Sequence, residues 1–205
     1  MQDLFNNIET KQDLFICHSG GAIGSDTEFE NNCELYGIKV KAYSYKTKSH
    51  TSPNKVEISD EDFNEGIIEV KKANTILKRW GIEKYMNLLS RNWSQVKYSK
   101  QIFAIGEIIE PGGKDKKGYR NNSKSQIVSG GTGYAVAMGI INGREIFVFD
   151  QSKSKWFKWS YNQERFIECN KPTITNPNFA GIGTREINEV GKQEIKDLLK
   201  RSFKK

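Results

Sequence analysis

The 205-residue chain has no long hydrophobic run. It contains no stretch of about 18 apolar residues, which is the least that a membrane-spanning helix requires. The N-terminal residues MQDLFNNIETKQD also do not combine a basic region with an apolar segment, as a signal peptide would. These absences predict a protein that has no membrane partner and is located in the cytoplasm.

Cysteine and histidine are scarce. The three cysteines, Cys17, Cys33 and Cys169, form no C-x-x-C pair, which argues against a disulfide framework and against a zinc site. We therefore expect buried, reduced thiols. The two histidines, His18 and His50, are too few and too widely separated to define a metal cluster, so no metal and no cofactor are expected. We interpret His18 as a pocket or structural residue, because no acidic partner completes a catalytic triad with it.

The chain also lacks a linker rich in proline, glycine or serine, so we predict a single domain over residues 1–205. Its composition, 36% hydrophobic and 28% charged, is typical of a soluble globular protein. Lysine and arginine number 32 against 25 acidic residues, a net charge of +7. This excess suits anionic partners such as nucleotides or nucleic acid, although a basic surface that only aids solubility explains it equally well.

Apolar runs bounded by turn residues predict core strands, and helical patterns lie between them. This alternation predicts an α/β fold with a mostly parallel sheet and helices on both faces. Residues 155–170 predict a small antiparallel hairpin at one edge, whose aromatic side chains pack against the core or a partner subunit. The expected strands are residues 14–18, 38–45, 101–108, 145–150 and 178–183, and the expected helices are 27–37, 60–80, 83–96, 133–143 and 188–203.

Two polar segments, residues 46–55 and 110–126, interrupt this pattern. Both are rich in turn-forming residues, so we expect them on the surface and mobile. Loops of this length are typical either of lids over a site or of disordered segments, and both alternatives stay open.

Three connections from a strand to a helix are rich in glycine. Glycine permits a positive φ and close backbone approach, which leaves the first amides of the next helix free to bind an anion. Ser25, with Glu28 three residues later, is expected to cap the first of these helices. In a parallel sheet all such turns lie on one edge, so the three are expected to converge on one crevice. A tight connection without any ligand is the alternative for each turn alone. The expected ligand-binding residues are Ser19, Gly20, Gly21, Ala22, Gly24 and Asp26, then Ser129, Gly130, Gly131, Thr132, Gly133 and Tyr134, and finally Gly181, Gly183, Thr184 and Arg185.

Three side chains at these turns have a more specific expected role. Arg185 offers a planar fork that binds phosphate through paired hydrogen bonds, unless it forms a salt bridge with Glu186 or Glu189. Asp26 either accepts hydrogen bonds from ribose hydroxyls or complements the helix dipole. Tyr134 either stacks on a base or packs against the core.

At these residues the chain resembles the SLOG superfamily, a Rossmann-like group that includes the LONELY GUY phosphoribohydrolases and the DNA-processing protein A family. The resemblance covers residues 19–30, 90–107, 129–150 and 179–187, and it is strongest to small bacteriophage members. It implies a Rossmann-like sheet, a nucleotide-derived small molecule at the glycine turns, a homo-oligomer, and the host cytoplasm as location if the protein is viral. Arg91 and Asn92 match an Arg-Asn pair near the nucleotide site in parts of the superfamily, which assigns them to the pocket. As an alternative, Arg91 caps a helix and Asn92 turns the chain.

The chain departs from the superfamily pattern in two ways. The G-x-G-[ST]-R signature usually opens such domains, whereas here residues 179–187 lie near the C-terminus. This order predicts a circular permutation in which the last strand inserts inside the sheet. The glutamate that assists N-glycosidic cleavage in LONELY GUY enzymes has no counterpart up to Met138, so no catalytic residue is assigned. Enzymatic activity stays open, with Asp26 or Glu107 able to act as acid or base if burial raises the pKa.

The sequence thus predicts a protein that binds a nucleotide or a nucleotide-derived ligand, such as an ADP-ribose-like molecule or a cyclic nucleotide. The bacteriophage resemblance extends this to a counter-defence protein that sequesters a host immune signal. The alternative is a hydrolase that acts on a nucleotide or an N-glycosidic bond. A nucleic-acid-binding module is the third interpretation, suggested by the charge of +7, and it predicts binding that weakens steeply with salt.

Overall fold

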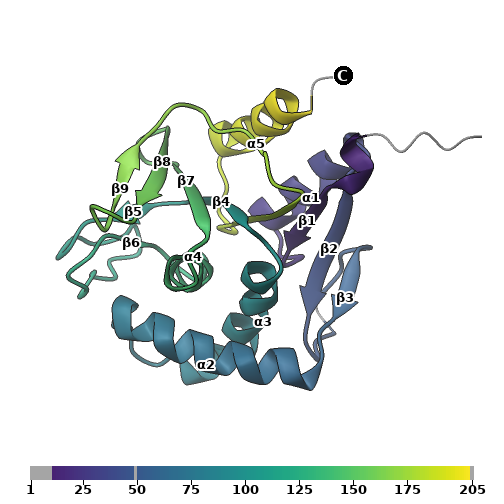
Figure 1. Cartoon of the computed structure of the whole chain (residues 1–205). Helices are drawn as coiled ribbons and strands as arrows, with labels where there is room; N and C mark the ends of the chain where they lie inside the picture. Colours follow the sequence, from purple (N-terminus) through teal and green to yellow (C-terminus); the bar gives the residue numbers. More distant parts are fainter. Residues whose placement is uncertain (1–10, 49, 204–205) are drawn as a thin grey trace, which may run out of the picture.

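The computed structural model describes residues 11–48 and 50–203 (Figure 1). Within them, an eight-stranded sheet has the order β3-β2-β1-β10-β4-β7-β8-β9, parallel from β3 to β7 and antiparallel from β7 to β9. The elements are η1 (Lys11–Leu14), β1 (Ile16–Ser19), α1 (Ser25–Leu35), β2 (Lys39–Ser44), β3 (Lys55–Glu57), α2 (Asp60–Leu77), η2 (Glu83–Tyr85), α3 (Met86–Lys97), β4 (Gln101–Gly106), β5 (Ile108–Ile109), β6 (Ile127–Val128), α4 (Thr132–Ile141), β7 (Glu145–Asp150), β8 (Lys155–Ser160), β9 (Arg165–Glu168), β10 (Asn178–Gly183) and α5 (Glu189–Ser202).

Helices cover both faces of this sheet. Figure 1 shows α1 and α5 on one side and α2, α3 and α4 on the other. Phe29 of α1 and Leu198 of α5 belong to one hydrophobic core, whereas Ile102 of β4 and Met138 of α4 belong to the other. Every residue of β4 is buried, which explains its continuous apolar run, since a central parallel strand faces a helix layer on each side. The predicted α/β fold with a mostly parallel sheet is confirmed.

The last strand of the chain lies inside the sheet. β10 pairs with β1 on one side and with β4 on the other, both in parallel, with Phe179 opposite Cys17 and also opposite Gln101. The predicted insertion is therefore confirmed, while the circular permutation stays a prediction. The sheet extends from β1 through β2 and β3 on one side of β10, and from β4 through β7 on the other side. A parallel sheet whose strand order reverses in this way opens a crevice at the carboxyl ends of its strands.

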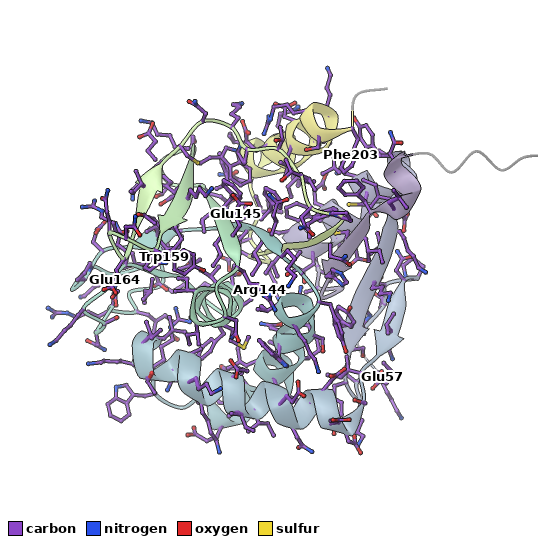
Figure 2. All side chains as sticks on the ribbon, in the orientation of Figure 1. Glu57, Arg144, Glu145, Trp159, Glu164 and Phe203 are labelled. Carbon is purple, nitrogen blue, oxygen red and sulfur yellow. The ribbon has the colours of Figure 1, made fainter. Side chains whose placement is uncertain are left out.

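The hairpin of β8 and β9 extends the sheet beyond β7, as expected. Three of its aromatic rings, those of Trp156, Trp159 and Phe166, are buried, whereas Tyr161 is exposed. Trp159 lies edge-on to Phe166 with ring centroids 5.0 Å apart, and Figure 2 labels Trp159 in this part of the molecule. Two structural features were not predicted. β3 adds a parallel edge strand next to β2, and β5 pairs with β6 in a separate antiparallel ribbon at the base of the 110–126 loop.

Some expected helix ends are wrong. Ser25 does not cap α1, because it is the first helical residue and its hydroxyl donates to the Thr184 carbonyl at 2.8 Å. Arg91 and Asn92 lie in the middle of α3, which excludes the alternative in which they cap a helix and turn the chain. Side-chain caps are present elsewhere, at Ser59 before α2 and at Asn188 before α5.

The thiols are free, but they are not all buried. Cys17 and Cys33 are buried as expected, whereas Cys169 is half-buried. At the end of α5, Phe203 packs edge-on against Phe15 with ring centroids 4.9 Å apart, and Figure 2 shows Phe203 next to the beginning of the described chain. Among residues 11–48 and 50–203, no helix combines the length and the apolar character that crossing a membrane requires.

Candidate functional site

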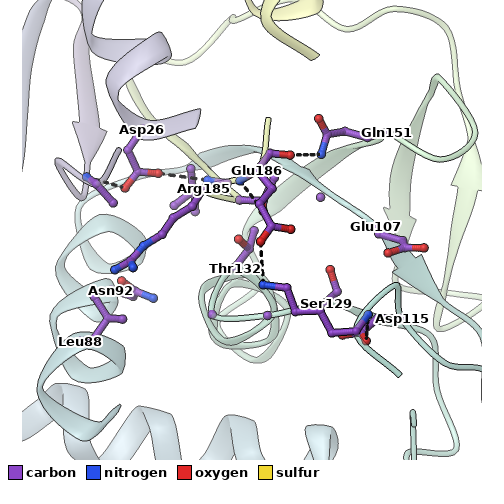
Figure 3. A pocket seen from close by; sticks show the side chains of 18 of the residues that line it. Asp26, Leu88, Asn92, Glu107, Asp115, Ser129, Thr132, Gln151, Arg185 and Glu186 are labelled. Carbon is purple, nitrogen blue, oxygen red and sulfur yellow. Dashed lines mark hydrogen bonds and ion pairs between the residues drawn. The ribbon is translucent and has the colours of Figure 1, made fainter. Parts of the chain in front are cut away.

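A cavity of about 470 Å³ opens at the carboxyl ends of β4 and β10 (Figure 3). This volume falls within the range of about 300–1,000 Å³ that is usual for small-molecule sites. All three glycine-rich turns contribute to its wall, together with α3 and the 110–126 loop. The expected site residues that line it are Ala22, Asp26, Arg91, Asn92, Ser129, Gly130, Gly131, Thr132, Gly183, Thr184 and Arg185.

The other expected residues do not line this cavity, and several of the glycines among them serve close packing instead. A Cβ atom at Gly20 would lie 1.9 Å from Nη1 of Arg91, and one at Gly21 would lie 2.2 Å from the ring of His50. Contact with a ligand is therefore not what requires glycine at these two positions. The residues outside the lining are Ser19, Gly20, Gly21, Gly24, Gly133, Tyr134 and Gly181.

Tyr134 belongs to the core. Only 3% of it is exposed, and its hydroxyl donates to Oδ1 of Asn74 at 2.7 Å. The guanidinium of Arg79 lies over its ring, 5.3 Å from the centroid. The interpretation in which Tyr134 stacks on a base is therefore wrong, because its ring packs in the core against Arg79 and does not line the cavity.

The first and third turns hold each other through Asp26. Oδ1 of Asp26 accepts from the Gly183 amide at 3.1 Å, and Oδ2 accepts from the Ala22 amide at 3.4 Å. The amide of Ser25 donates to the Thr184 carbonyl at 3.1 Å. The expectation that the first amides of α1 point into open space is therefore wrong for Ser25 and for Thr27, whose amide donates to the Ala22 carbonyl at 3.2 Å, while the amide of Asp26 has no acceptor among the described residues. Asp26 fixes the geometry of two turns from its buried position.

The second turn differs, because its amides are free. The N–H groups of Gly130, Gly131 and Thr132 have no hydrogen-bond acceptor in the described part of the chain. Arg79 donates to the carbonyls of Gly130 and Val128, the latter at 2.7 Å. Since the peptide bond is planar and trans, fixing the Gly130 carbonyl directs the Gly131 N–H the opposite way, away from Arg79. The N-terminus of α4 thus offers a rigid anion-binding turn.

Helix α3 forms the opposite wall with two buried polar side chains. Arg91 is 7% exposed and donates from Nη1 to the Gly20 carbonyl at 2.6 Å. Asn92 is 8% exposed, and its amide group makes no hydrogen bond to any residue that the structure describes. The amide atoms themselves are not fully buried, so they face the open cavity. Asn92 therefore offers one donor group and one acceptor to a polar ligand in the cavity.

The charges on this wall perturb one another. Burial raises the pKa of Asp26 to about 6, and the nearby positive charge of Arg91 opposes that rise. Burial also lowers the pKa of Arg91; Asp26 opposes this effect, and Arg185 adds to it. The two guanidiniums are therefore close neighbours on one side of the cavity.

Arg185 is exposed at the cavity mouth and unpaired. Over residues 11–48 and 50–203 it has no hydrogen bond or ion pair from its side chain. Its expected alternative partners are occupied, since Glu186 pairs with Lys117 at 2.8 Å and Glu189 pairs with Lys192 at 2.7 Å. The salt-bridge alternative for Arg185 is thus wrong.

Several lining residues were not among the expected site residues. Glu107 and Gln151 follow the ends of β4 and β7, and Lys117 and Glu186 face each other across the mouth (Figure 3). The 110–126 loop therefore reaches the site, and Asp115 shapes it by accepting from the Lys117 and Tyr119 amides, each at 2.9 Å. The carboxyl ends of parallel strands are usual ligand sites, so the position of Glu107 directly after a buried strand was an available signal.

Neither histidine lines this cavity. Burial lowers the pKa of His18 to about 4, and its ring nitrogens lie 2.8 Å from the Tyr43 hydroxyl and 3.1 Å from Oδ1 of Asn178. His18 lines a separate pocket against β1 and β2, in keeping with a structural role. Within the described residues, no group of three His, Cys, Asp or Glu side chains is placed to hold a metal ion.

The site therefore combines free backbone amides from one turn, an unpaired guanidinium from another and, from α3, an amide side chain that is open to the cavity. Comparison with protein-family models, with curated proteins and with solved structures finds no match to this chain, so the resemblance to the SLOG superfamily stays a prediction.

Proposed function

We propose that this protein binds a nucleotide-derived small molecule in the cavity, with a phosphate group at the N-terminus of α4. The observation that carries the proposal is the convergence of unpartnered donors on one cavity: the amides of Gly130 and Gly131, the guanidinium of Arg185 and the side chain of Asn92. A Cβ atom at Gly130 or at Gly131 would have no described heavy atom within 4 Å, so a ligand can approach the backbone there.

The energetics favour an anion at this point. A helix N-terminus stabilises a negative charge by about 0.3–1 kcal/mol, and by up to ~2 kcal/mol when the site is partly buried. A charge-assisted hydrogen bond from a guanidinium adds about 1.5–3 kcal/mol. Arg185 can form this hydrogen bond without losing a protein partner, because its side chain has no hydrogen bond or ion pair among the described residues. Together these terms amount to about 2–5 kcal/mol, so contacts of the rest of the ligand with the wall supply the remainder of the roughly 8 kcal/mol that micromolar binding requires.

Holding the ligand intact is the first form of this function. The groups that would meet the phosphate are all donors, and Asp26 already uses both oxygens to hold backbone amides. Such a site suits sequestration of a signalling nucleotide, as expected for a counter-defence protein. The expected homo-oligomer stays a prediction beside it.

Hydrolysis is the second candidate, and Glu107 favours it. Its carboxylate lines the cavity without a hydrogen bond to any described residue, so it could act on a bound glycosidic bond. Glu107 is the carboxylate to test before Asp26, because both oxygens of Asp26 already accept from backbone amides that hold two turns.

Isothermal titration calorimetry with AMP, ATP, ADP-ribose and cyclic nucleotides tests the proposal, with chromatography of the recovered ligand to detect cleavage. Arg185→Gln is expected to weaken binding by about ten- to a hundredfold, in line with one lost charge-assisted contact. Arg165→Gln, on the exposed hairpin strand β9, is the matched control and should leave binding unchanged. Absence of binding by every nucleotide would reject the proposal, and cleaved product would select hydrolysis over sequestration.

A further inference from the structure

One carboxylate of the cavity has no partner. Glu107 is half-buried, and its side chain makes no hydrogen bond or ion pair with the described residues. The hydroxyl of Ser129 next to it is also free in that part of the chain, and the two residues are joined through the Ser129 amide, which donates to the Glu107 carbonyl at 2.9 Å. An ionised carboxylate can only accept hydrogen bonds, so this corner of the cavity favours a ligand group that donates them.

The charges of the cavity are separated. Arg91 and Arg185 neighbour each other on the side of α3 and Asp26, whereas Figure 3 shows Glu107 and Asp115 on the opposite side, away from Asn92. No lysine of the 110–126 loop forms an ion pair with Glu107 among the described residues, although Lys116 and Lys117 also line the cavity. Lys117 forms an ion pair with Glu186 at 2.8 Å, and the charge of Lys116 likewise acts on Glu186.

A ligand that fits this arrangement has an anionic part and an uncharged part rich in hydroxyls. Phosphate oxygens meet the guanidiniums and the free amides of α4, but a second phosphate beside Glu107 would meet a like charge that no ion pair balances. Vicinal sugar hydroxyls are donors that a carboxylate binds with both oxygens. The amide side chain of Asn92 has no hydrogen bond to a described residue and is open to the cavity, so it adds a donor and an acceptor for a polar ligand.

We propose that Glu107 is a specificity-determining residue, which binds the hydroxyls of a terminal sugar and selects nucleoside diphosphate sugars over nucleotides that end in a phosphate. This inference rests on the proposed function and narrows its ligand class. ADP-ribose and ATP are the decisive pair of probes, because they share the adenosine and the first two phosphates. They differ in ending with a sugar or with a third phosphate.

Calorimetry with both probes on the wild-type protein and on three variants tests the proposal. The wild type is expected to bind ADP-ribose at least about tenfold more tightly than ATP. Glu107→Gln should weaken ADP-ribose binding by about ten- to a hundredfold, the equivalent of one charged hydrogen bond, and should bind ATP no worse than the wild type does. Glu107→Asp keeps the charge on a shorter side chain, so it should lose affinity for ADP-ribose and still reject ATP. Glu61→Gln, on the exposed N-terminal turn of α2, makes the same charge change away from the cavity and should alter neither affinity.

The outcomes separate this inference from the function on which it rests. Equal binding of ADP-ribose and ATP to the wild type, or wild-type affinity for ADP-ribose in Glu107→Gln, would overturn the role of Glu107 and leave nucleotide binding in place. Failure of ADP-ribose, ATP, AMP and the cyclic nucleotides to bind the wild-type protein would overturn both. Thermal unfolding of each variant confirms that a loss of affinity comes from a folded protein.

Discussion

Replacement of Asp26 by asparagine should remove a pH-dependent contribution to the free energy of unfolding. Asp26 is buried, and its pKa in the folded protein is raised from 3.8 to about 6. Between these two values the folded state binds a proton that the unfolded state has already lost. The wild-type protein therefore loses stability as the pH rises from about 4 to above 6, and it regains that stability on acidification.

The size of this contribution follows from the two pKa values. One pKa unit corresponds to about 1.4 kcal/mol, so the difference between about 6 and 3.8 is worth about 3 kcal/mol. Asparagine keeps an oxygen that can accept from the Gly183 amide, but its NH₂ group cannot accept from the Ala22 amide. That lost hydrogen bond costs about 1 kcal/mol at every pH. The substitution should thus be harmful near pH 4 and neutral or favourable near pH 7.

Urea denaturation at pH 4 and at pH 7 measures this difference. The wild-type free energy of unfolding should change between the two pH values by about 2.4 kcal/mol more than that of Asp26→Asn, in the direction of lower stability at pH 7, since the unfolded state is already partly protonated at pH 4. Other groups titrate equally in both proteins, so they cancel in this comparison. Asp197→Asn, at a half-exposed site on α5, controls for the charge change. Parallel pH profiles of the free energy of unfolding for wild type and Asp26→Asn would refute the inference that burial raises the pKa of Asp26.

Two further predictions concern the residues that hold the site together. Arg79→Met removes both side-chain hydrogen bonds to the second turn, so it should lower both nucleotide affinity and the melting temperature. Arg120→Met, on the exposed 110–126 loop, is the control and should leave the melting temperature unchanged. Deletion of residues 178–205 removes β10 from between β1 and β4 and should leave an unfolded product by circular dichroism, and a folded product would contradict a central position for this strand.

The core strands could be predicted from sequence because their signal is local. The strands at residues 145–150 and 178–183 are apolar runs that end at turn residues, and their observed bounds match the expected ones. β3 gives no such signal. Its residues Lys55–Glu57 are all exposed, and they form a strand only because β2 lies beside them. Pairing between distant segments cannot be inferred from a three-residue stretch without apolar periodicity.

The errors at the site have a common physical cause, which is competition for hydrogen bonds across the fold. Ser25 has the spacing of a capping box, but the Thr184 carbonyl takes its hydroxyl. Tyr134 lies on α4, a helix that is buried on nearly every side, so its sequence does not distinguish the cavity side from the core side. Glycine content likewise does not tell a turn that approaches a ligand from one that packs against Arg91 or His50.

The three glycine turns therefore contribute unequally, although they meet at one cavity. The first and third turns bind several of their amides to Asp26 and to each other, which makes them a rigid frame, whereas the second leaves three consecutive amides without an acceptor among the described residues. Removing one carboxylate from the frame should therefore affect stability more than affinity, whereas removing Arg79 from the second turn should affect both. A ligand site of this kind depends less on the number of glycine turns than on which of their amides the protein leaves unbound.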